Sequence, residues 1–183
     1  MGEVRIIGGQ WKRSKLPVPD APGLRPTSDR IRETLFNWLG QTLTGWRVLD
    51  AFAGSGALGF EAASRDAAEV VLVERDAKLA AGLRASVQRL KAATMKVHTA
   101  DALAWMRAAP RGTFDLILLD PPFAADLFDV ALAAAVPLLA EGGLIYVESP
   151  HAITPPAGFT AWREGRAGTV HYRLLRPEDN PAS

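Results

Sequence analysis

From residue 46 onward, short apolar runs alternate with amphipathic stretches. In the stretch 76–91, Leu79, Leu83, Val87 and Leu90 recur on one helical face. The run 114–119 is almost wholly apolar, as expected of a strand buried on both faces of a parallel sheet. The pattern predicts strands at 47–52, 70–73, 95–98, 114–119 and 144–148, and helices at 58–64, 76–91, 102–109 and 127–139. This alternation predicts a doubly wound, mostly parallel α/β sheet.

The two ends of the chain follow a different pattern. Residues 159–164 and 169–175 predict an antiparallel hairpin that closes one sheet edge and brings the sheet to seven strands. Residues 4–18 predict two short strands around a turn, and 29–41 predict a helix.

Local signals refine these ends and the chain's division. Thr27 or Ser28 can cap the helix that follows, and Gly142-Gly143 is expected to turn the chain before the fifth parallel strand. We expect a basic N-terminal extension over 1–45, a main domain over 46–177 and a flexible tail over 178–183.

Composition narrows the possible classes of protein. The chain has 183 residues, which suits one domain, and 48% of them are apolar, which argues against disorder. It has no cysteine, which excludes disulfides, thiolate metal sites and cysteine nucleophiles. Its three histidines match no metal-ligand spacing, so no metal is expected. No apolar run is long enough for a membrane span and no signal peptide is visible, so we expect a cytoplasmic protein that does not interact with membranes.

Charge is unevenly distributed along the chain. Residues 1–47 hold eight Lys and Arg against four Asp and Glu, a net charge of +4, whereas the whole chain carries +1. The remainder is therefore −3. A basic segment on a mildly acidic body suggests that a polyanion docks on one side, although a solvated surface would give the same count.

Polar residues gather where the predicted strands end. Because the carboxyl ends of parallel strands share one edge of a sheet, these residues are expected to surround one ligand site. They are Asp50, Gly54, Glu74, Asp101, Asp120 and Glu148.

The first of these strand ends opens a glycine-rich turn, with glycines at 54, 56 and 59. Such a turn lets backbone approach a ligand, but dinucleotide enzymes use it too. Asp50 would repel a pyrophosphate and suits a ligand that carries an ammonium group. Glu74 can accept both hydroxyls of a ribose, which fits any nucleoside. Asp101 could accept from an adenine amino group beside Ala102, and it could also cap the helix that follows.

Asp120-Pro121-Pro122-Phe123 follows the apolar strand predicted at 114–119 and suggests the chemistry of the site. An exocyclic amine on a base is a poor nucleophile, because its lone pair is delocalised into the ring. A carboxylate and a backbone carbonyl can hold its N–H groups, two prolines fix the backbone, and Phe123 offers a stacking face. Asp120 would orient the amine more than deprotonate it.

Taken together, these motifs resemble class I S-adenosylmethionine-dependent methyltransferases, and more narrowly the RsmD family of bacterial 16S rRNA guanine-N2 methyltransferases. The resemblance covers about residues 3–175. It rests on Arg5 to Gly9, Arg25-Pro26-Thr27, Arg32 to Leu39, Asp50 to Gly59, Val73-Glu74, Asp101 to Leu103, and Asp120 to Phe123.

The resemblance implies a role for each matching residue. Around the cofactor, S-adenosyl-L-methionine, it places Asp50, Ala53, Gly54, Ser55, Gly56, Glu74, Asp101 and Ala102. At the target guanine it places the catalytic residues Asp120, Pro121, Pro122 and Phe123. Against RNA it places Arg5, Trp11, Lys12, Arg13, Lys15, Arg25, Thr27 and Arg30.

The implied partner is 16S rRNA within an assembling or assembled small ribosomal subunit. The protein is expected to act on it as a monomer. Two alternatives remain open at this point. An adenine-N6 or cytosine-N4 methyltransferase on RNA or DNA would use the same Asp-Pro-Pro-aromatic loop, although 183 residues leave no space for a large target-recognition insert. A nicotinamide-dependent oxidoreductase would share the glycine pattern, but Asp50 and the Asp120 loop count against it.

Overall fold

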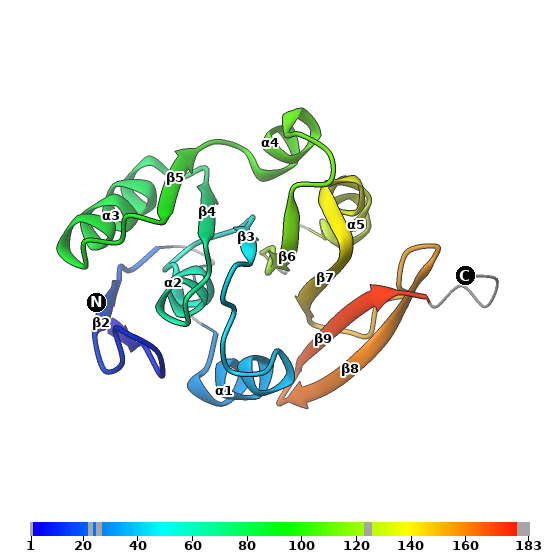
Figure 1. The fold of residues 1–183 in the computed structure, drawn as a ribbon, viewed down its shortest axis with the longest axis horizontal. Helices are drawn as coiled ribbons and strands as arrows, with labels where there is room; N and C mark the ends of the chain where they lie inside the picture. The colour runs from blue at the N-terminus through cyan, green and yellow to red at the C-terminus, as the bar shows by residue number, and fades with distance from the viewer. Residues whose placement is uncertain (1, 22–23, 25–26, 123–125, 179–183) are drawn as a thin grey trace.

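A seven-stranded sheet forms the centre of the molecule, as Figure 1 shows for the computed structural model. The structure describes residues 2–21, 24, 27–122 and 126–178. Five strands are parallel, and the last two form an antiparallel hairpin beside β7. In spatial order the strands are β5 (Met95–Thr99), β4 (Glu69–Glu74), β3 (Arg47–Asp50), β6 (Phe114–Leu119), β7 (Leu139–Ser149), β9 (Val170–Pro177) and β8 (Phe159–Ala167). The predicted fold class is confirmed.

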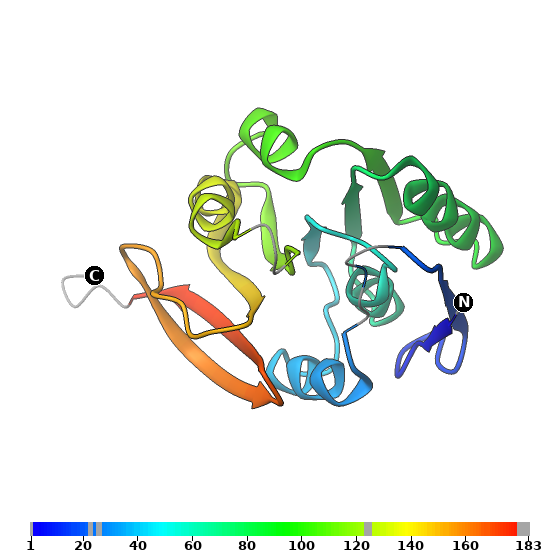
Figure 2. The same cartoon turned by 180° about the vertical axis from the view of Figure 1, so that it is seen from behind.

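Helices cover both faces of this sheet. One face packs against α1 (Asp29–Trp38), α2 (Ala57–Ser64) and α3 (Ala77–Arg89). The other packs against α4 (Ala102–Ala108) and α5 (Phe128–Ala135), which is followed by a 3-10 turn, η2 (Val136–Leu138). The central strands β3, β4 and β6 are buried on both sides, which explains their apolar sequences. Figures 1 and 2 show β5 with α3 at one end of the layers and the β8–β9 hairpin at the other.

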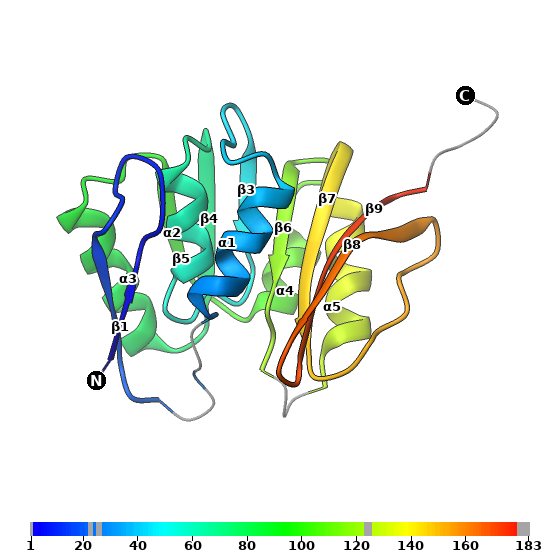
Figure 3. The ribbon, with the colours of Figure 1, turned by 90° about the horizontal axis from the view of Figure 1, so that it is seen from below.

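The N-terminal segment packs on the main sheet through a shared core. It begins with a two-stranded hairpin of β1 (Gly2–Arg5) and β2 (Lys15–Val18). Ile6 and Leu16 of this hairpin are buried in the same cluster as Leu35 of α1 and Val48 of β3. Figure 3 shows α1 lying across the face of the sheet. The extension is therefore packed against the domain that carries the sheet.

The region between α5 and β7 departs from the prediction of one helix and then a turn. The helix ends at Ala135, and Pro137 lies in the single 3-10 turn that follows, since proline cannot continue the helical hydrogen bonding. The strand then begins at Leu139, and Gly142 and Gly143 lie within it, at a shift in its pairing with β6. Gly142 has φ +75°, and a side chain on Gly143 would meet the carbonyl oxygen of Ala140 at 2.9 Å. The predicted turn at these glycines is wrong: they form an irregularity inside a longer strand.

Candidate functional site

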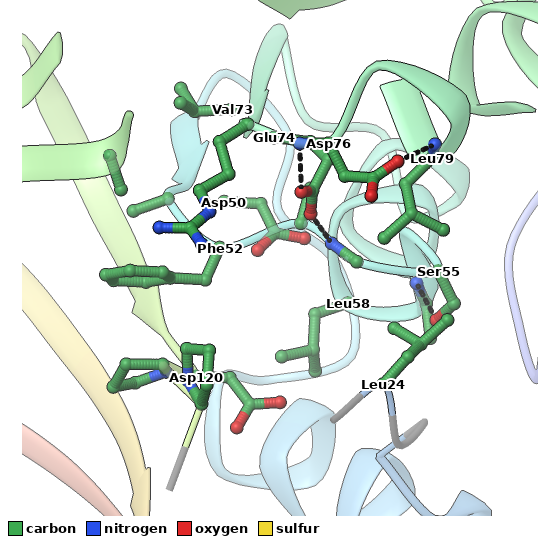
Figure 4. Close-up of a pocket in the computed structure, with 18 of the residues that line it drawn as sticks. Leu24, Asp50, Phe52, Ser55, Leu58, Val73, Glu74, Asp76, Leu79 and Asp120 are labelled. Atoms are coloured by element: carbon green, nitrogen blue, oxygen red, sulfur yellow. Dashed lines mark hydrogen bonds between the residues drawn. The ribbon is translucent and has the colours of Figure 1, made fainter. Parts of the chain in front are cut away.

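The ends of four neighbouring strands surround one cavity of about 550 Å³. Asp50, Glu74, Asp101 and Asp120 line it, at the ends of β3, β4, β5 and β6. Figure 4 shows Asp50, Glu74 and Asp120 around this space, with Leu58 and Phe52 between them. The structure therefore brings these four residues and Gly54 together as the sequence predicted, whereas Glu148 is fully buried and is absent from the lining of the cavity.

The glycine-rich turn between β3 and α2 is held by Asp50. Its Oδ2 accepts a hydrogen bond of 3.0 Å from the N–H of Gly59, in the first turn of the helix. A side chain on Gly59 would lie 2.3 Å from Leu72 and 3.0 Å from this same oxygen, so only glycine lets α2 approach the sheet here. Gly56 has φ +82° and begins the helix. The predicted close turn is confirmed.

The carboxyl group of Asp50 has an unusually high pKa. Asp50 is 1% exposed. Its pKa is raised from 3.8 to about 7, mainly by burial; the charges of Glu74 and Glu148 contribute to the rise, whereas the Gly59 N–H acts to lower it. A cation arriving at this carboxyl group would favour its ionised form.

Glu74 ties the first loop to the end of β4. Its Oε1 accepts from the N–H of Gly54 at 2.9 Å, and its Oε2 accepts from the N–H of Asp76 at 2.9 Å. A carboxylate has about four acceptor positions, so these two bonds leave capacity for ligand hydroxyls. The backbone bonds fix the carboxylate in the cavity wall before any ligand arrives (Figure 4).

Asp101 caps α4, because its Oδ2 accepts from the N–H of Ala104 at 3.0 Å. The capping role is confirmed, and its contact with a base stays a prediction. The neighbouring Ala102 is buried, and both residues line the cavity together with Ala53, Gly54 and Ser55. Gly56 is absent from that lining and acts at the start of the helix.

The end of β6 carries the predicted catalytic loop. Asp120, Pro121 and Pro122 line the cavity, and Phe123 lies outside the described residues. The Oδ2 of Asp120 lies 3.3 Å from the hydroxyl Oγ1 of Thr27. That hydroxyl also donates to Oε2 of Glu148 at 2.8 Å. Thr27 and Glu148 are buried, so Thr27 belongs to the wall of the site.

Of the residues predicted to contact RNA, six lie on the N-terminal segment's surface. Arg5, Lys12, Arg13, Lys15 and Arg30 are exposed, and Trp11 is half-buried against the core. Arg25 lies outside the described residues. A second cavity of about 370 Å³ is lined by Arg5 and Lys15 together with Thr27. Thr27 thus borders both the basic hairpin and the strand-end cavity.

Sequence reasoning missed one buried ionic group behind this surface. Arg32 of α1 is fully buried and donates from Nη1 to Oε1 of Glu61 and to the carbonyl oxygen of Arg5, both at 3.0 Å. Arg65 donates to the other oxygen of Glu61 at 2.9 Å. In sequence, these arginines look like any other surface charge, and only the run Arg32 to Leu39 gave a signal, through its resemblance to a family motif.

The part of the chain that the structure describes holds neither a metal-ligating cluster nor a membrane-spanning helix. No group of His, Cys, Asp and Glu side chains there is arranged to hold a metal ion. Among those residues no helix is both long and apolar enough to cross a membrane.

Comparison with known proteins connects this site to a family. The family model described as "Conserved hypothetical protein 95" matches residues 4–176. Ribosomal RNA small subunit methyltransferase D of Escherichia coli strain K12 is 46% identical, over 97% of this chain and 91% of its own length. The protein of the same name from Haemophilus influenzae is 41% identical, over 96% and 94%.

A solved structure agrees with the sequence relatives. The structure of yhhF from Escherichia coli has a TM-score of 0.87 and 44% identity, covering 98% of this chain and 100% of that one. The match therefore extends over the N-terminal hairpin as well as the sheet. The chain belongs to the RsmD family of methyltransferases.

Proposed function

We propose that this chain transfers a methyl group from S-adenosyl-L-methionine to the exocyclic N2 of a guanine in 16S rRNA. The single observation that carries the proposal is the convergence of Asp50, Glu74 and Asp120 on one cavity, in a chain of this family. Relatives named ribosomal RNA small subunit methyltransferase D support rRNA as the substrate. The protein would bind this RNA in the cytoplasm, within an assembling or assembled small ribosomal subunit.

The cavity fits a cationic nucleoside cofactor. Its described lining holds five carboxylates against one guanidinium, that of Arg75; the acids are Asp50, Glu74, Asp76, Asp101 and Asp120. A buried carboxyl group whose pKa is raised by burial and by neighbouring acids is stabilised as an anion when a positive ligand group arrives. The sulfonium and ammonium groups of the cofactor supply that charge. Asp50 would face the ammonium, Glu74 the ribose hydroxyls, and Asp101 with Ala102 the adenine.

The protein's part in the reaction is positioning. When bound, the cofactor supplies an electrophilic methyl group. Asp120 and the carbonyl oxygen of Pro121 would accept the two N–H groups of the guanine amine and turn its lone pair toward that methyl. Phe123 would stack on the base. These contacts complement the positive charge that develops on the nitrogen, and the proton leaves during or after transfer.

The N-terminal segment would dock the RNA. Its exposed cations, on the hairpin and on the first turn of α1, can neutralise phosphates. The second cavity, lined by Arg5 and Lys15 as well as by Glu3 and Asp29, shares Thr27 with the strand-end cavity, so the hairpin lies beside the site. A small basic surface distinguishes few nucleotide sequences by itself. We therefore expect that rRNA folded together with ribosomal proteins presents the target guanine.

The test is methylation of small subunits purified from cells that lack this activity, followed by mass spectrometry of the nucleosides. We expect N2-methylguanosine at one position. Asp120→Ala should abolish the product while leaving cofactor affinity nearly unchanged. The matched control is Asp115→Ala, since Asp115 lies on the same strand at its other end, where it accepts from the N–H of Arg47.

Two results would overturn the proposal. One is a methyl group on adenine N6, on cytosine N4, or on no nucleoside. The other is turnover by Asp120→Ala within about tenfold of the unmodified chain, a difference of only ~1.4 kcal/mol in the barrier.

A further inference from the structure

The hydroxyl of Thr27 lies between two carboxyl groups from neighbouring strands. Its Oγ1 is 2.8 Å from Oε2 of Glu148 and 3.3 Å from Oδ2 of Asp120. Glu148 comes from β7 and Asp120 follows β6, and these strands pair in parallel. Residues separated by 93 and 121 positions in sequence are therefore connected through one side-chain oxygen.

Thr27 is held firmly from its backbone side. It directly precedes Ser28, whose side chain accepts from the N–H of Ile31 and begins α1. The Nε of Arg32 donates to the carbonyl oxygen of Thr27 at 3.4 Å, and Arg32 is itself fixed by Glu61. Thr27 is 5% exposed. Because its backbone is fixed, the Thr27 hydroxyl has a defined direction. A side chain that only contacts an RNA phosphate at the surface would not need this fixation.

The two contacts differ in strength and in consequence. A hydroxyl has one proton, which here faces oxygens of both carboxyl groups; the shorter distance makes Glu148 its main acceptor and Asp120 the weaker one. Glu148 is fully buried at the end of β7, so this donation stabilises a carboxylate that water does not reach. The longer contact holds Oδ2 of Asp120 against the Thr27 hydroxyl and so restrains the orientation of this carboxylate.

We propose that Thr27 is a positioning residue for methyl transfer: its hydroxyl, fixed by Glu148, sets the orientation of the Asp120 carboxylate toward the amine. The inference rests on the proposed function and deepens it. It gives Thr27 a role in the catalytic step, distinct from the RNA contact that the sequence suggested. It also makes α1 a support of the catalytic loop as well as part of the basic extension.

Steady-state kinetics on small subunits test this role. Thr27→Val keeps the shape of the side chain and removes the hydroxyl. We expect kcat to fall about tenfold or more, because an Asp120 carboxylate that the hydroxyl no longer orients is misplaced for the amine, and misplacement of a catalytic group costs at least this factor. KM for the subunit and the Kd for the cofactor should change less than about twofold, because neither depends on the orientation of Asp120. Thr27→Ser restores the hydroxyl and should recover kcat to within about threefold.

The matched control is Thr34→Val, in the helix that Thr27 precedes, where the hydroxyl donates to the carbonyl oxygen of Arg30. It should leave kcat unchanged. If Thr27→Val does not fold, Thr27→Ala gives the same test with more space for water, and the thermal midpoint of each variant is measured alongside.

The outcomes separate this inference from the function beneath it. An unmodified chain that does not methylate guanine overturns both. If the unmodified chain is active, a normal kcat in Thr27→Val, or in Thr27→Ala if only that variant folds, overturns the positioning role alone. A raised KM with normal kcat has the same effect and assigns Thr27 to RNA contact instead. A loss of kcat that Thr27→Ser does not recover also counts against the role.

Discussion

Asp50 serves the fold and the ligand site with the same carboxyl group. The Gly59 N–H that it accepts holds the first turn of α2 against the sheet. Burial and the charges of Glu74 and Glu148 work against its ionised form and raise its pKa to about 7. In the ligand-free protein the folded state therefore holds this proton more tightly than the unfolded state does. From this residue alone, stability falls as the pH rises from about 4 to about 7.

Cofactor binding should favour the ionised form of Asp50 instead of the protonated form, so cofactor affinity should depend on pH. A ligand ammonium favours ionised Asp50, so the affinity for S-adenosyl-L-methionine should rise about tenfold per pH unit below 7 and level off above it. Calorimetric titration measures this directly and should also detect a released proton. Asp50→Asn, which keeps an acceptor for the Gly59 N–H, should remove the slope.

A ligand without the amino-acid group provides the control. Methylthioadenosine lacks the ammonium, so its affinity should vary little over the same pH range. Equal slopes for both ligands would show that Asp50 does not face the ammonium.

At the scale of the elements, buried ions join the N-terminal hairpin, α1 and α2. Glu61 of α2 accepts from the N–H groups of Ile7 and Gly8 and from both Arg32 and Arg65. Arg32 and Glu61 are fully buried, and Arg65 is 6% exposed. The carboxylate of Glu61 thus connects the hairpin, α1 and α2, a connection that the hydrophobic periodicity of the sequence does not predict.

Glu61→Gln should destabilise the fold strongly. The amide keeps one acceptor and nearly the same volume, but it leaves the buried Arg32 without its full counter-charge, at a cost of about 3 kcal/mol or more. Urea denaturation measures the change. Glu69→Gln is the matched control, because Glu69 pairs with exposed Lys96 at 3.8 Å and should cost less than about 1 kcal/mol. Similar losses in the two variants would contradict the central role of Glu61.

The sequence predicted the sheet well, because buried parallel strands and amphipathic helices leave strong periodic signals. It also placed Asp50, Glu74, Asp101 and Asp120 at one edge, since strand ends in this topology cannot lie elsewhere. It failed where a residue's surroundings come from distant segments. Thr27 gave no periodic signal for its contacts with Asp120 and Glu148, and charge counting could not reveal that Arg32 is buried.

For the molecule as a whole, the shared core keeps the basic hairpin in a fixed position beside the catalytic cavity. Ile6 and Leu16 join the cluster that also holds Val48 of the sheet. The exposed cations of the hairpin are therefore carried on a rigid support, and Thr27 lies between them and Asp120. Charge on this face should affect how RNA docks without altering the transfer step itself.

Replacing Lys12, Arg13 and Lys15 with alanine tests that separation. Each lost phosphate contact reduces the magnitude of the slope of log K for RNA binding against log salt concentration by about 0.7 to 0.9. Loss of all three contacts should therefore reduce it by up to about three times that amount. The kcat on saturating subunits and the cofactor affinity should stay unchanged, because none of the three lines the strand-end cavity. Lys96, Arg107 and Arg111, also exposed, give a control triple of equal charge on other elements. If both triples flatten the slope equally, RNA responds to net charge alone, and the hairpin is not its docking surface.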